Sequence, residues 1–404
     1  MAQRRTYLDH NATSALRPAA RGAMIDALSK TGNPSSVHGE GREARRLIEV
    51  ARRQVAELAG CSTDGVIFTS GATEAAHMAL TPLIASDGAP RPASKLYVLE
   101  TEHPCVLSGG RFTQEDVADI PVHEDGLIDL DTLDKVLEDH DYDVGAPYVA
   151  VQLVNSETGV IQPVAEMAKR VRLRGGYVLC DAVQAFGRIA VDASELGCDF
   201  LLISSHKLGG PQGVGALLVH HTILDVPSAL RGGGQETNRR AGTENVAAIA
   251  GFGAAAEHVA KNMHENMQIS ELRDSIETAL VTICSRHGLL EELTIFGKSA
   301  PRVPNTCLFA LNGMRAQTAL INLDIEGIAV SSGSACSSGK VGSSHVLQAM
   351  GVDDDLAECA LRVSLGWNST MEDVEHFERV FAALVKRSGL GQKTSLESQL
   401  GDVA

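Results

Sequence analysis

Residues 200–210 read Phe-Leu-Leu-Ile-Ser-Ser-His-Lys-Leu-Gly-Gly. The first four, bounded by small polar residues, predict a short buried strand. Lys207 directly after such a strand is unusual, because lysine is rarely buried without a partner. A solvated lysine is the ordinary alternative. A partly desolvated amine would instead have a lowered pKa and would favour a Schiff base with a carbonyl compound.

Other short apolar runs share this organisation. They predict strands at Val66–Phe68, Leu96–Leu99, Tyr148–Val154, Tyr177–Cys180 and Val214–Val219. Most are separated by enough chain for a crossover helix, which is the pattern of a mainly parallel sheet covered on both faces. Between Gly39 and Gly60 the apolar residues recur at helical spacing, so we expect a surface helix there.

Polar groups follow five of these strands. They are Ser70 to Glu74, Thr101 to His103, Asn155, Asp181 to Gln184, and Ser204 to Lys207. Ligands of open α/β sheets bind outside the carboxyl ends of the strands, so these groups are expected to converge on one cleft. Each has an ordinary alternative: a helix N-cap at Ser70, a capping role for Asp181, or structural histidines. Together, a phosphate-binding turn, a carboxylate, an imidazole and an amine are what a pyridoxal cofactor requires.

The character of the sequence changes near residue 260. An amphipathic stretch over 261–286 is followed by short apolar runs at 306–311, 328–330 and 361–364. We expect a large domain over 14–260 and a smaller α+β domain formed by 1–13 and 261–387. Residues 388–404 have little apolar content and are expected to form a mobile tail.

Composition restricts the function classes. With 404 residues, 44% of them hydrophobic, the chain can bury a full core. A formal charge of -16 argues against direct nucleic-acid binding, because such proteins concentrate Lys and Arg on one face. The longest apolar stretch, 246–256, is shorter than the about 20 residues that cross a bilayer. No apolar signal core follows Arg4 and Arg5, so we expect no membrane span and a cytoplasmic location.

The eight cysteines include no Cys-x-x-Cys pair, and most are expected to be reduced and buried. Cys180, Cys284 and Cys307 have apolar neighbours, as structural cysteines do. Cys336 differs, because residues 331–339 are too small and polar to pack as core. The composition favours an exposed loop whose thiol can act as a nucleophile, rather than a structural cysteine.

In order and spacing these motifs resemble the cysteine desulfurases of the NifS/IscS type, which belong to the class V aminotransferases of pyridoxal-phosphate fold type I. The resemblance covers nearly all of residues 6–385. Its motifs are Tyr7 to Thr13, Gly32 to His38, Phe68 to Glu74, Thr101 to His103, Asn155 to Gly159, Asp181 to Gln184, Ser204 to Lys207, Arg239 to Thr243 and Ser331 to Ser338. It implies a large domain with a mainly parallel seven-stranded sheet covered by helices, and a smaller α+β domain.

The resemblance also implies a cofactor, pyridoxal 5′-phosphate (PLP), and a set of residues that bind it. The set comprises Ala72, Thr73, His103, Asn155, Asp181, Gln184, Ser204, His206, Lys207 and Thr243. Within it, Lys207 would form the Schiff base, Asp181 would pair with the ring nitrogen, and His103 would stack on the ring. Thr243 would reach the phosphate of a partner subunit, which implies a homodimer.

The implied activity removes sulfur from L-cysteine, giving L-alanine and a persulfide on Cys336. Lys207, Cys336 and His103 would be catalytic, with His103 as proton shuttle. Asn33, Asn155 and Arg362 would bind the substrate, and Arg362 would grip its carboxylate. The persulfide would serve iron–sulfur cluster assembly or other sulfur transfer, through a scaffold or another acceptor protein. No resident metal is expected, and Cys336 would at most contact a nascent cluster transiently.

Departures from the family pattern leave the partner open. Residues 340–344 and Gly366-Trp367 differ from the usual residues, and the tail from Ser388 lacks the segment that helps the housekeeping type dock its scaffold. The alternatives among enzymes are a selenocysteine lyase or another class V enzyme such as an aminotransferase. A non-catalytic sulfur-carrier scaffold, or a nucleotide-binding α/β protein, would leave Lys207 without a purpose.

Overall fold

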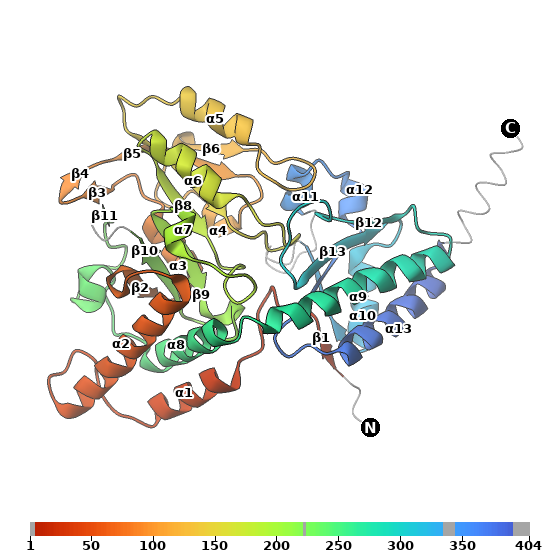
Figure 1. The fold of residues 1–404 in the computed structure, drawn as a ribbon, viewed down its shortest axis with the longest axis horizontal. Coiled ribbons are helices and arrows are strands. Elements are labelled where there is room, and N and C mark those ends of the chain that lie inside the picture. The colour runs from red at the N-terminus through yellow and green to blue at the C-terminus, as the bar shows by residue number, and fades with distance from the viewer. Residues whose placement is uncertain (1–4, 221–223, 334–343, 391–404) are drawn as a thin grey trace, which may run out of the picture.

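The computed structural model describes residues 5–220, 224–333 and 344–390. Cys336 and the end of the predicted tail lie outside the described residues. Two sheets of different size organise the described chain, and the N-terminal segment runs between them (Figure 1).

Seven strands form the larger sheet, in the order β2-β10-β9-β8-β7-β5-β6. They are β2 (Val66–Thr69), β5 (Ala93–Leu99), β6 (Val117–Ile120), β7 (Ala146–Gln152), β8 (Tyr177–Asp181), β9 (Phe200–Ser204) and β10 (Gly215–Val219). All neighbours are parallel except β10, which is antiparallel to both β2 and β9. The mainly parallel seven-stranded sheet implied by the sequence is therefore confirmed. The strand β6 was absent from the runs predicted on apolar content, because it is a partly exposed edge strand.

Helices cover both faces of this sheet, so its central strands are buried on both sides. One face packs against α1 (Pro18–Leu28), α2 (Gly39–Ala59), α5 (Leu130–Glu138), α6 (Val164–Leu173), α7 (Ala193–Leu196) and α8 (Val246–Lys261). The other packs against α3 (Ala72–Ala79) and α4 (Pro104–Leu107). Helix α2 is the surface helix predicted between Gly39 and Gly60, and Gly60 ends it in the left-handed conformation (φ 65°) that favours glycine.

The smaller sheet has four antiparallel strands in the order β12-β13-β16-β15. They are β12 (Leu293–Ile295), β13 (Thr306–Leu311), β15 (Ser331–Ser332) and β16 (Ala360–Ser364). One face packs against α9 (Glu265–Arg286), α10 (Ala316–Ile325) and α13 (Met371–Ser388), where the rings of Phe377 and Phe381 stack at 5.5 Å. The other carries α11 (His345–Ala349) and α12 (Asp354–Ala357). A further small sheet contains β3 (Ala85–Ser86), β4 (Ala89–Pro90) and β11 (Leu224–Asp225).

The N-terminal segment connects the two parts. Strand β1 (Thr6–Tyr7) pairs in parallel with β14 (Ile328–Ala329), and Asp9 forms a bridge with Ser364 at the end of β16. The chain then continues toward the carboxyl ends of the strands of the large sheet. There the carbonyl oxygen of Asn11 accepts a hydrogen bond from the Lys207 amine. The division at residues 13, 260 and 387 remains a prediction.

His10 lies buried at this junction, and its titration makes the free energy of unfolding depend on pH. Its Nδ1 is 3.2 Å from Ser14 Oγ, and burial together with the charge of Arg188 lowers its pKa to about 4. An unfolded histidine titrates near about 6.5, so between about pH 6.5 and 4 the unfolded chain binds a proton that the folded chain does not. The contribution of His10 to folding is therefore lost as the pH falls through this range.

We expect a His10→Asn variant to show a flatter pH dependence than the wild type. From pH 7 to 5 the free energy of unfolding should fall by about 2 kcal/mol more in the wild type than in the variant. Denaturant titration at both pH values measures this difference. His77→Asn, at an exposed position of α3, is the control. Parallel curves for wild type and His10→Asn would contradict the prediction.

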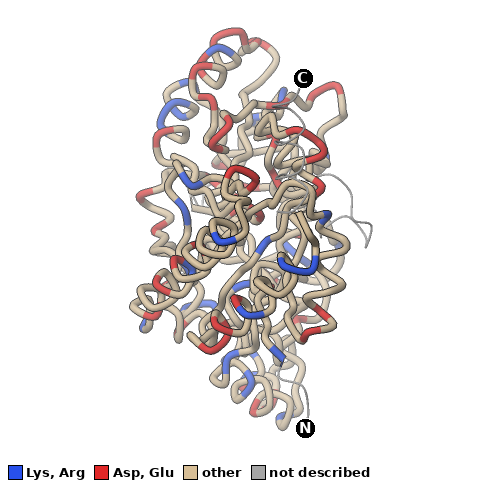
Figure 2. The backbone as a smooth tube through the Cα atoms, turned by 90° about the vertical axis from the view of Figure 1, so that its right-hand side faces the viewer, with Lys and Arg blue, Asp and Glu red and all other residues tan. Residues whose placement is uncertain are grey.

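The cysteines, the apolar helices and the charged residues were also the subject of expectations from composition. Cys180, Cys284 and Cys307 are buried, as predicted, and the described cysteines are free thiols. None of the described helices is long and apolar enough for a membrane crossing. Figure 2 shows Lys and Arg distributed among Asp and Glu along the chain rather than gathered in one stripe.

Candidate functional site

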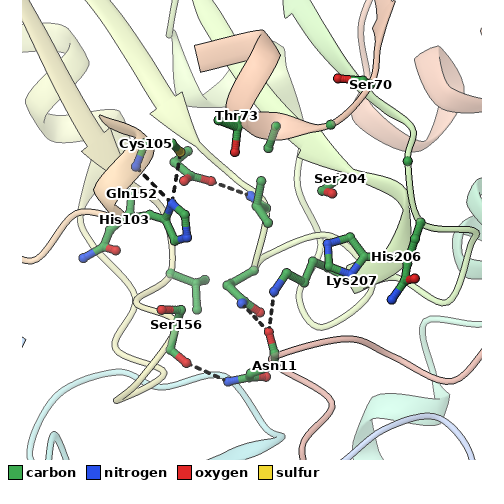
Figure 3. Close-up of a pocket in the computed structure, with 18 of the residues that line it drawn as sticks. Asn11, Ser70, Thr73, His103, Cys105, Gln152, Ser156, Ser204, His206 and Lys207 are labelled. Carbon is green, nitrogen blue, oxygen red and sulfur yellow. Dashed lines mark hydrogen bonds between the residues drawn. The ribbon is translucent and has the colours of Figure 1, made fainter. Parts of the chain in front are cut away.

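A cavity of about 430 Å³ lies at the carboxyl ends of the parallel strands, a size typical of small-molecule sites (Figure 3). It is formed where β8, β9 and the turn before α3 meet the N-terminal segment and β16. Nine residues singled out in the sequence line it: Ala72, Thr73, His103, Asp181, Gln184, Ser204, His206, Lys207 and Arg362. The predicted convergence of strand-end residues on one cleft therefore holds for the first eight, whereas Arg362 reaches the cavity from β16 of the smaller sheet.

Three predicted residues do not line this cavity. Asn155 is buried beside it, where its Oδ1 accepts the backbone N–H groups of Glu157 and Thr158, both at 2.9 Å. Asn33 and Thr243 are exposed and lie outside the cavity lining of their own chain. The roles given to these three stay predictions. Cys336 lies in a part of the chain that the structure does not describe.

An anion-binding cradle forms one wall of the cavity. Helix α3 begins at Ala72 after Gly71, and no side chain caps it, so the first backbone N–H groups face outward. A helix N-terminus attracts anions through these groups and through its dipole. Thr73, Ser204 and His206 face the same region (Figure 3). A Cβ on Gly215 would lie 3.0 Å from Gly71 Cα, so glycine there lets β10 approach the turn closely. This wall suits a phosphate group.

Lys207 presents its amine at the opposite side. Its Nζ donates to the carbonyl oxygens of Asn11 at 2.6 Å and Ala12 at 2.9 Å (Figure 3). Gln184 Nε2 donates to the same Asn11 carbonyl at 3.0 Å, while the buried Gln184 Oε1 has no hydrogen-bond partner among the described residues. A ligand hydroxyl would satisfy that oxygen.

Asp181 ends strand β8 inside the cavity. Its Oδ1 accepts the Val183 N–H at 2.9 Å, and burial raises the pKa of Asp181 to about 6, opposed by that hydrogen bond and by the charge of Lys207. A buried carboxylate is stabilised by a cationic N–H donor. A protonated ring nitrogen of a bound ligand would provide one.

His103 is neutral in this environment. It caps α4, and its Nδ1 accepts the Cys105 N–H at 3.2 Å. Burial, with smaller effects from Lys207 and His345, lowers the pKa of His103 to about 4. The Cys105 Sγ is 3.0 Å from the same Nδ1, and burial raises the pKa of this thiol, so it is protonated and donates. Since Nδ1 is an acceptor, the ring carries its proton on Nε2, which faces the cavity (Figure 3).

Arg362 is 2% exposed and lines the cavity from strand β16. Its Nη2 is 2.9 Å from Asp9 Oδ1 and its Nη1 donates to the Ser156 carbonyl at 3.0 Å. Its Nε has no partner among the described residues. A buried guanidinium with an unused donor is suited to an incoming carboxylate.

Several lining residues were not assigned a role from sequence. Asn11 and Ser156 act through backbone carbonyl groups, which every residue has, so no sequence signal marks them. Gln152, the last residue of β7, donates to Thr101 Oγ1 at 2.8 Å. It had a sequence signal, because it is a polar residue within the otherwise apolar run 148–154. Cys105 follows His103 by two residues, and the apolar residues around it gave no reason to separate it from structural cysteines.

Comparison with known proteins agrees with this geometry. Residues 6–377 match the family described as Aminotransferase class-V. The cysteine desulfurase IscS of Dictyoglomus turgidum is 36% identical over 390 residues, which are 95% of this chain and 95% of that protein. A cysteine desulfurase of Enterobacter agglomerans is 38% identical over 374 residues, 91% of this chain and 90% of that protein.

A solved structure also resembles the whole fold. A NifS-like protein from Rickettsia africae has a TM-score of 0.84 at 32% identity, and the match covers 95% of this chain and 100% of that chain. A cysteine desulfurase from Thermococcus onnurineus is 23% identical with a TM-score of 0.77, which supports the fold alone.

Proposed function

Because this chain belongs to the class V aminotransferase family, and within it to the cysteine desulfurases of the IscS/NifS type, we propose that it takes sulfur from L-cysteine at the Lys207 cavity. The family is PLP-dependent, and PLP is the proposed cofactor. One observation carries the proposal: an amine, a buried carboxylate, an anion cradle and a guanidinium line the same cavity.

The chain's residues fit PLP. The N-terminus of α3, with Thr73, Ser204 and His206, would hold the phosphate, and Asp181 would pair with the ring nitrogen. Gln184 Oε1 would accept a hydrogen bond from the ring hydroxyl of PLP, and Lys207 would hold the cofactor covalently. When bound, PLP supplies an electrophilic carbon and a ring that accepts an electron pair from the substrate.

The substrate would be oriented by Arg362. Its guanidinium lies on β16, so the carboxylate of cysteine would be fixed relative to Lys207 and His103. Lys207 would move the proton at Cα. The Nε2–H of His103 would donate a hydrogen bond to the substrate sulfur. The cavity is lined in part by buried groups, which limits competing water.

Sulfur transfer would end on Cys336. Its thiolate would form an S–S bond with the substrate sulfur while the C–S bond breaks, and protonation of the carbon skeleton gives alanine. Overall, cysteine and the Cys336 thiol become alanine and the Cys336 persulfide, so atoms and electrons balance without an external oxidant. The acceptor of the persulfide, an iron–sulfur scaffold or another protein, the homodimer and the cytoplasmic location are part of this proposal.

The activity is tested by adding L-cysteine and a thiol reductant to the PLP-loaded protein. We expect alanine and sulfide in equal amounts. Turnover of L-selenocysteine beside L-cysteine distinguishes a selenocysteine lyase, which would prefer selenium strongly. A protein that shows the visible absorbance of bound PLP but gives neither product from cysteine would contradict the proposed substrate. A protein that cannot be loaded with PLP would contradict the proposed cofactor.

We expect Arg362→Lys to raise the KM for L-cysteine about 30-fold, because a single ammonium cannot replace a two-pronged contact with the carboxylate. The visible absorbance of bound PLP should remain. Steady-state alanine formation measures KM and kcat. Arg315→Lys, at an exposed ion pair with Asp355, is the matched control. A KM equal to that of the wild type would contradict the role of Arg362.

A further inference from the structure

Glu157 carries a buried carboxyl group that the proposed chemistry does not use. It lies in the turn over 155–159, which follows β7, and it is 4% exposed. Burial raises the pKa of Glu157, while a hydrogen bond from Ser344 and the charge of Arg362 oppose that shift. Burying a carboxyl group is costly unless it is partnered, so the contacts of Glu157 indicate what it does.

Two residues that lie 11 positions apart in the sequence meet at one oxygen of this carboxyl group. The Ser344 hydroxyl donates to Glu157 Oε2 at 2.6 Å. Gly333 packs so closely against the same Oε2 that an added Cβ would overlap it. Residues 334–343, which include Cys336, lie outside the described residues, so Gly333 and Ser344 are the two flanks of that segment. Glu157 therefore brings both flanks to one point.

The turn that carries Glu157 is itself fixed to the cavity. Asn155 Oδ1 accepts the Glu157 N–H at 2.9 Å. The carbonyl oxygen of Ser156 accepts Arg362 Nη1 and Asn11 Nδ2, both at 3.0 Å (Figure 3). Arg362 is the group proposed to bind the substrate carboxylate, so the position of the two flanks is related to the position of the substrate.

His345 adds a second contact on the C-terminal flank. Its Nε2 is 2.9 Å from the carbonyl oxygen of Glu102. A carbonyl oxygen only accepts hydrogen bonds, so Nε2 is the donor. Glu102 directly precedes His103, which is proposed to donate to the substrate sulfur. The C-terminal flank is therefore fixed to two separate turns that contribute residues to the cavity wall.

Capping of a helix alone does not explain these contacts. Ser344 caps α11 by accepting the Leu347 N–H at 3.1 Å. That cap uses a lone pair of the hydroxyl and places no demand on a buried carboxyl group. It also gives no reason for the close approach of Gly333 to Glu157.

We propose that Glu157 is a positioning residue for sulfur transfer, acting through the two flanks of the segment that carries Cys336. It holds Gly333 and Ser344 together against the turn that contacts Arg362. A tethered nucleophile reacts faster when fewer positions are open to it. Glu157 thus raises the rate of sulfur transfer and has no part in moving the Cα proton. The inference rests on the proposed function, which places the persulfide on Cys336.

Two rates of the PLP-loaded protein test the inference. Alanine formed from L-cysteine in the first turnover, sampled by rapid acid quench without reductant, reports sulfur transfer to Cys336. Exchange of the Cα hydrogen of L-alanine, the product, with solvent deuterium is followed by NMR and depends on Lys207 and Arg362 but on no sulfur. We expect Ser344→Ala and Gly333→Ala to slow alanine formation about tenfold, because the flanks lose their fixed position. Deuterium exchange should stay at the wild-type rate.

Two variants of Glu157 separate positioning from general loss of structure. Glu157→Gln keeps an oxygen that accepts the Ser344 hydroxyl, so it should retain most of the wild-type rate of alanine formation. Glu157→Leu offers no acceptor and should slow alanine formation about tenfold, again with unchanged deuterium exchange. Ser62→Ala, which removes a serine cap from a turn outside the cavity lining, is the control and should match the wild type in both rates.

Wild-type alanine formation in Ser344→Ala or Gly333→Ala would overturn the inference, as would a parallel fall of both rates in these variants. Equal losses in Glu157→Gln and Glu157→Leu would overturn it too, because the hydrogen bond would then not matter. If Glu157→Leu does not fold, the two flank variants still decide. Failure of the proposed function is recognised separately, as wild-type protein that exchanges the Cα hydrogen of alanine but forms no alanine from cysteine.

Discussion

Replacing Lys207 by alanine is expected to lower alanine formation from L-cysteine by at least about 10³-fold. Lys207 is the one lysine among the described residues that lines the cavity, and its Nζ donates hydrogen bonds to the carbonyl groups of Asn11 and Ala12. Those contacts hold the amine on the side of the cavity opposite the anion cradle. A cofactor bonded to Lys207, with its phosphate in the cradle, would span the cavity between them. The variant loses both the covalent anchor and the group that moves the Cα proton.

The measurement combines turnover with absorbance. Lys207→Ala should still bind PLP through the cradle and Asp181, but the visible spectrum of the bound cofactor should change. Lys261→Ala, at an exposed ion pair with Glu257, is the control and should match the wild type. Thermal unfolding of the protein without PLP verifies that Lys207→Ala folds. An unchanged spectrum with normal alanine formation would contradict the assignment of Lys207.

Much of the fold was predictable because buried parallel strands leave a strong signal. The strands β8 and β9 are fully buried and appear as continuous apolar runs, each ending in a polar residue. The strand β6 is a partly exposed edge strand, and β15 has only two serines, so neither carries that signal. The helix over Gly39 to Ala59 was predictable from its spacing and from the glycine that ends it.

The site was predictable where it depends on side chains at strand ends, and less so elsewhere. Asp181 and Lys207 follow apolar runs, and both line the cavity. The contact between Arg362 and Asp9 joins residues 353 positions apart, and no local pattern reports it. Asn33 and Thr243 lie outside the cavity of their own chain, so the fold of one chain does not explain the roles predicted for them.

Two cysteines, Cys105 and Cys336, are candidates for the nucleophile that accepts sulfur, and the structure argues against Cys105. Cys105 is the only cysteine among the described residues that lines the cavity. Burial raises the pKa of this thiol, and it donates to His103 Nδ1. A thiol that stays protonated is a poor nucleophile, because the thiolate is the reactive form. Cys105 is therefore not expected to accept sulfur, and Cys336 stays the proposed acceptor.

Cys336→Ala is accordingly expected to keep its PLP absorbance while sulfide release from L-cysteine falls at least about 10³-fold, because a tethered nucleophile is lost. Mass spectrometry after a single addition of cysteine, without reductant, should find one added sulfur atom on the Cys336 peptide of the wild type and none on any peptide of the variant. Cys61→Ala, a half-buried cysteine outside the cavity, is the control and should form the persulfide normally. Added sulfur on the Cys105 peptide, or sulfide release by Cys336→Ala at the wild-type rate, would contradict the persulfide role of Cys336. In the first case the protonated state inferred for Cys105 would be wrong as well, because a thiol that donates to His103 could not have attacked the substrate sulfur.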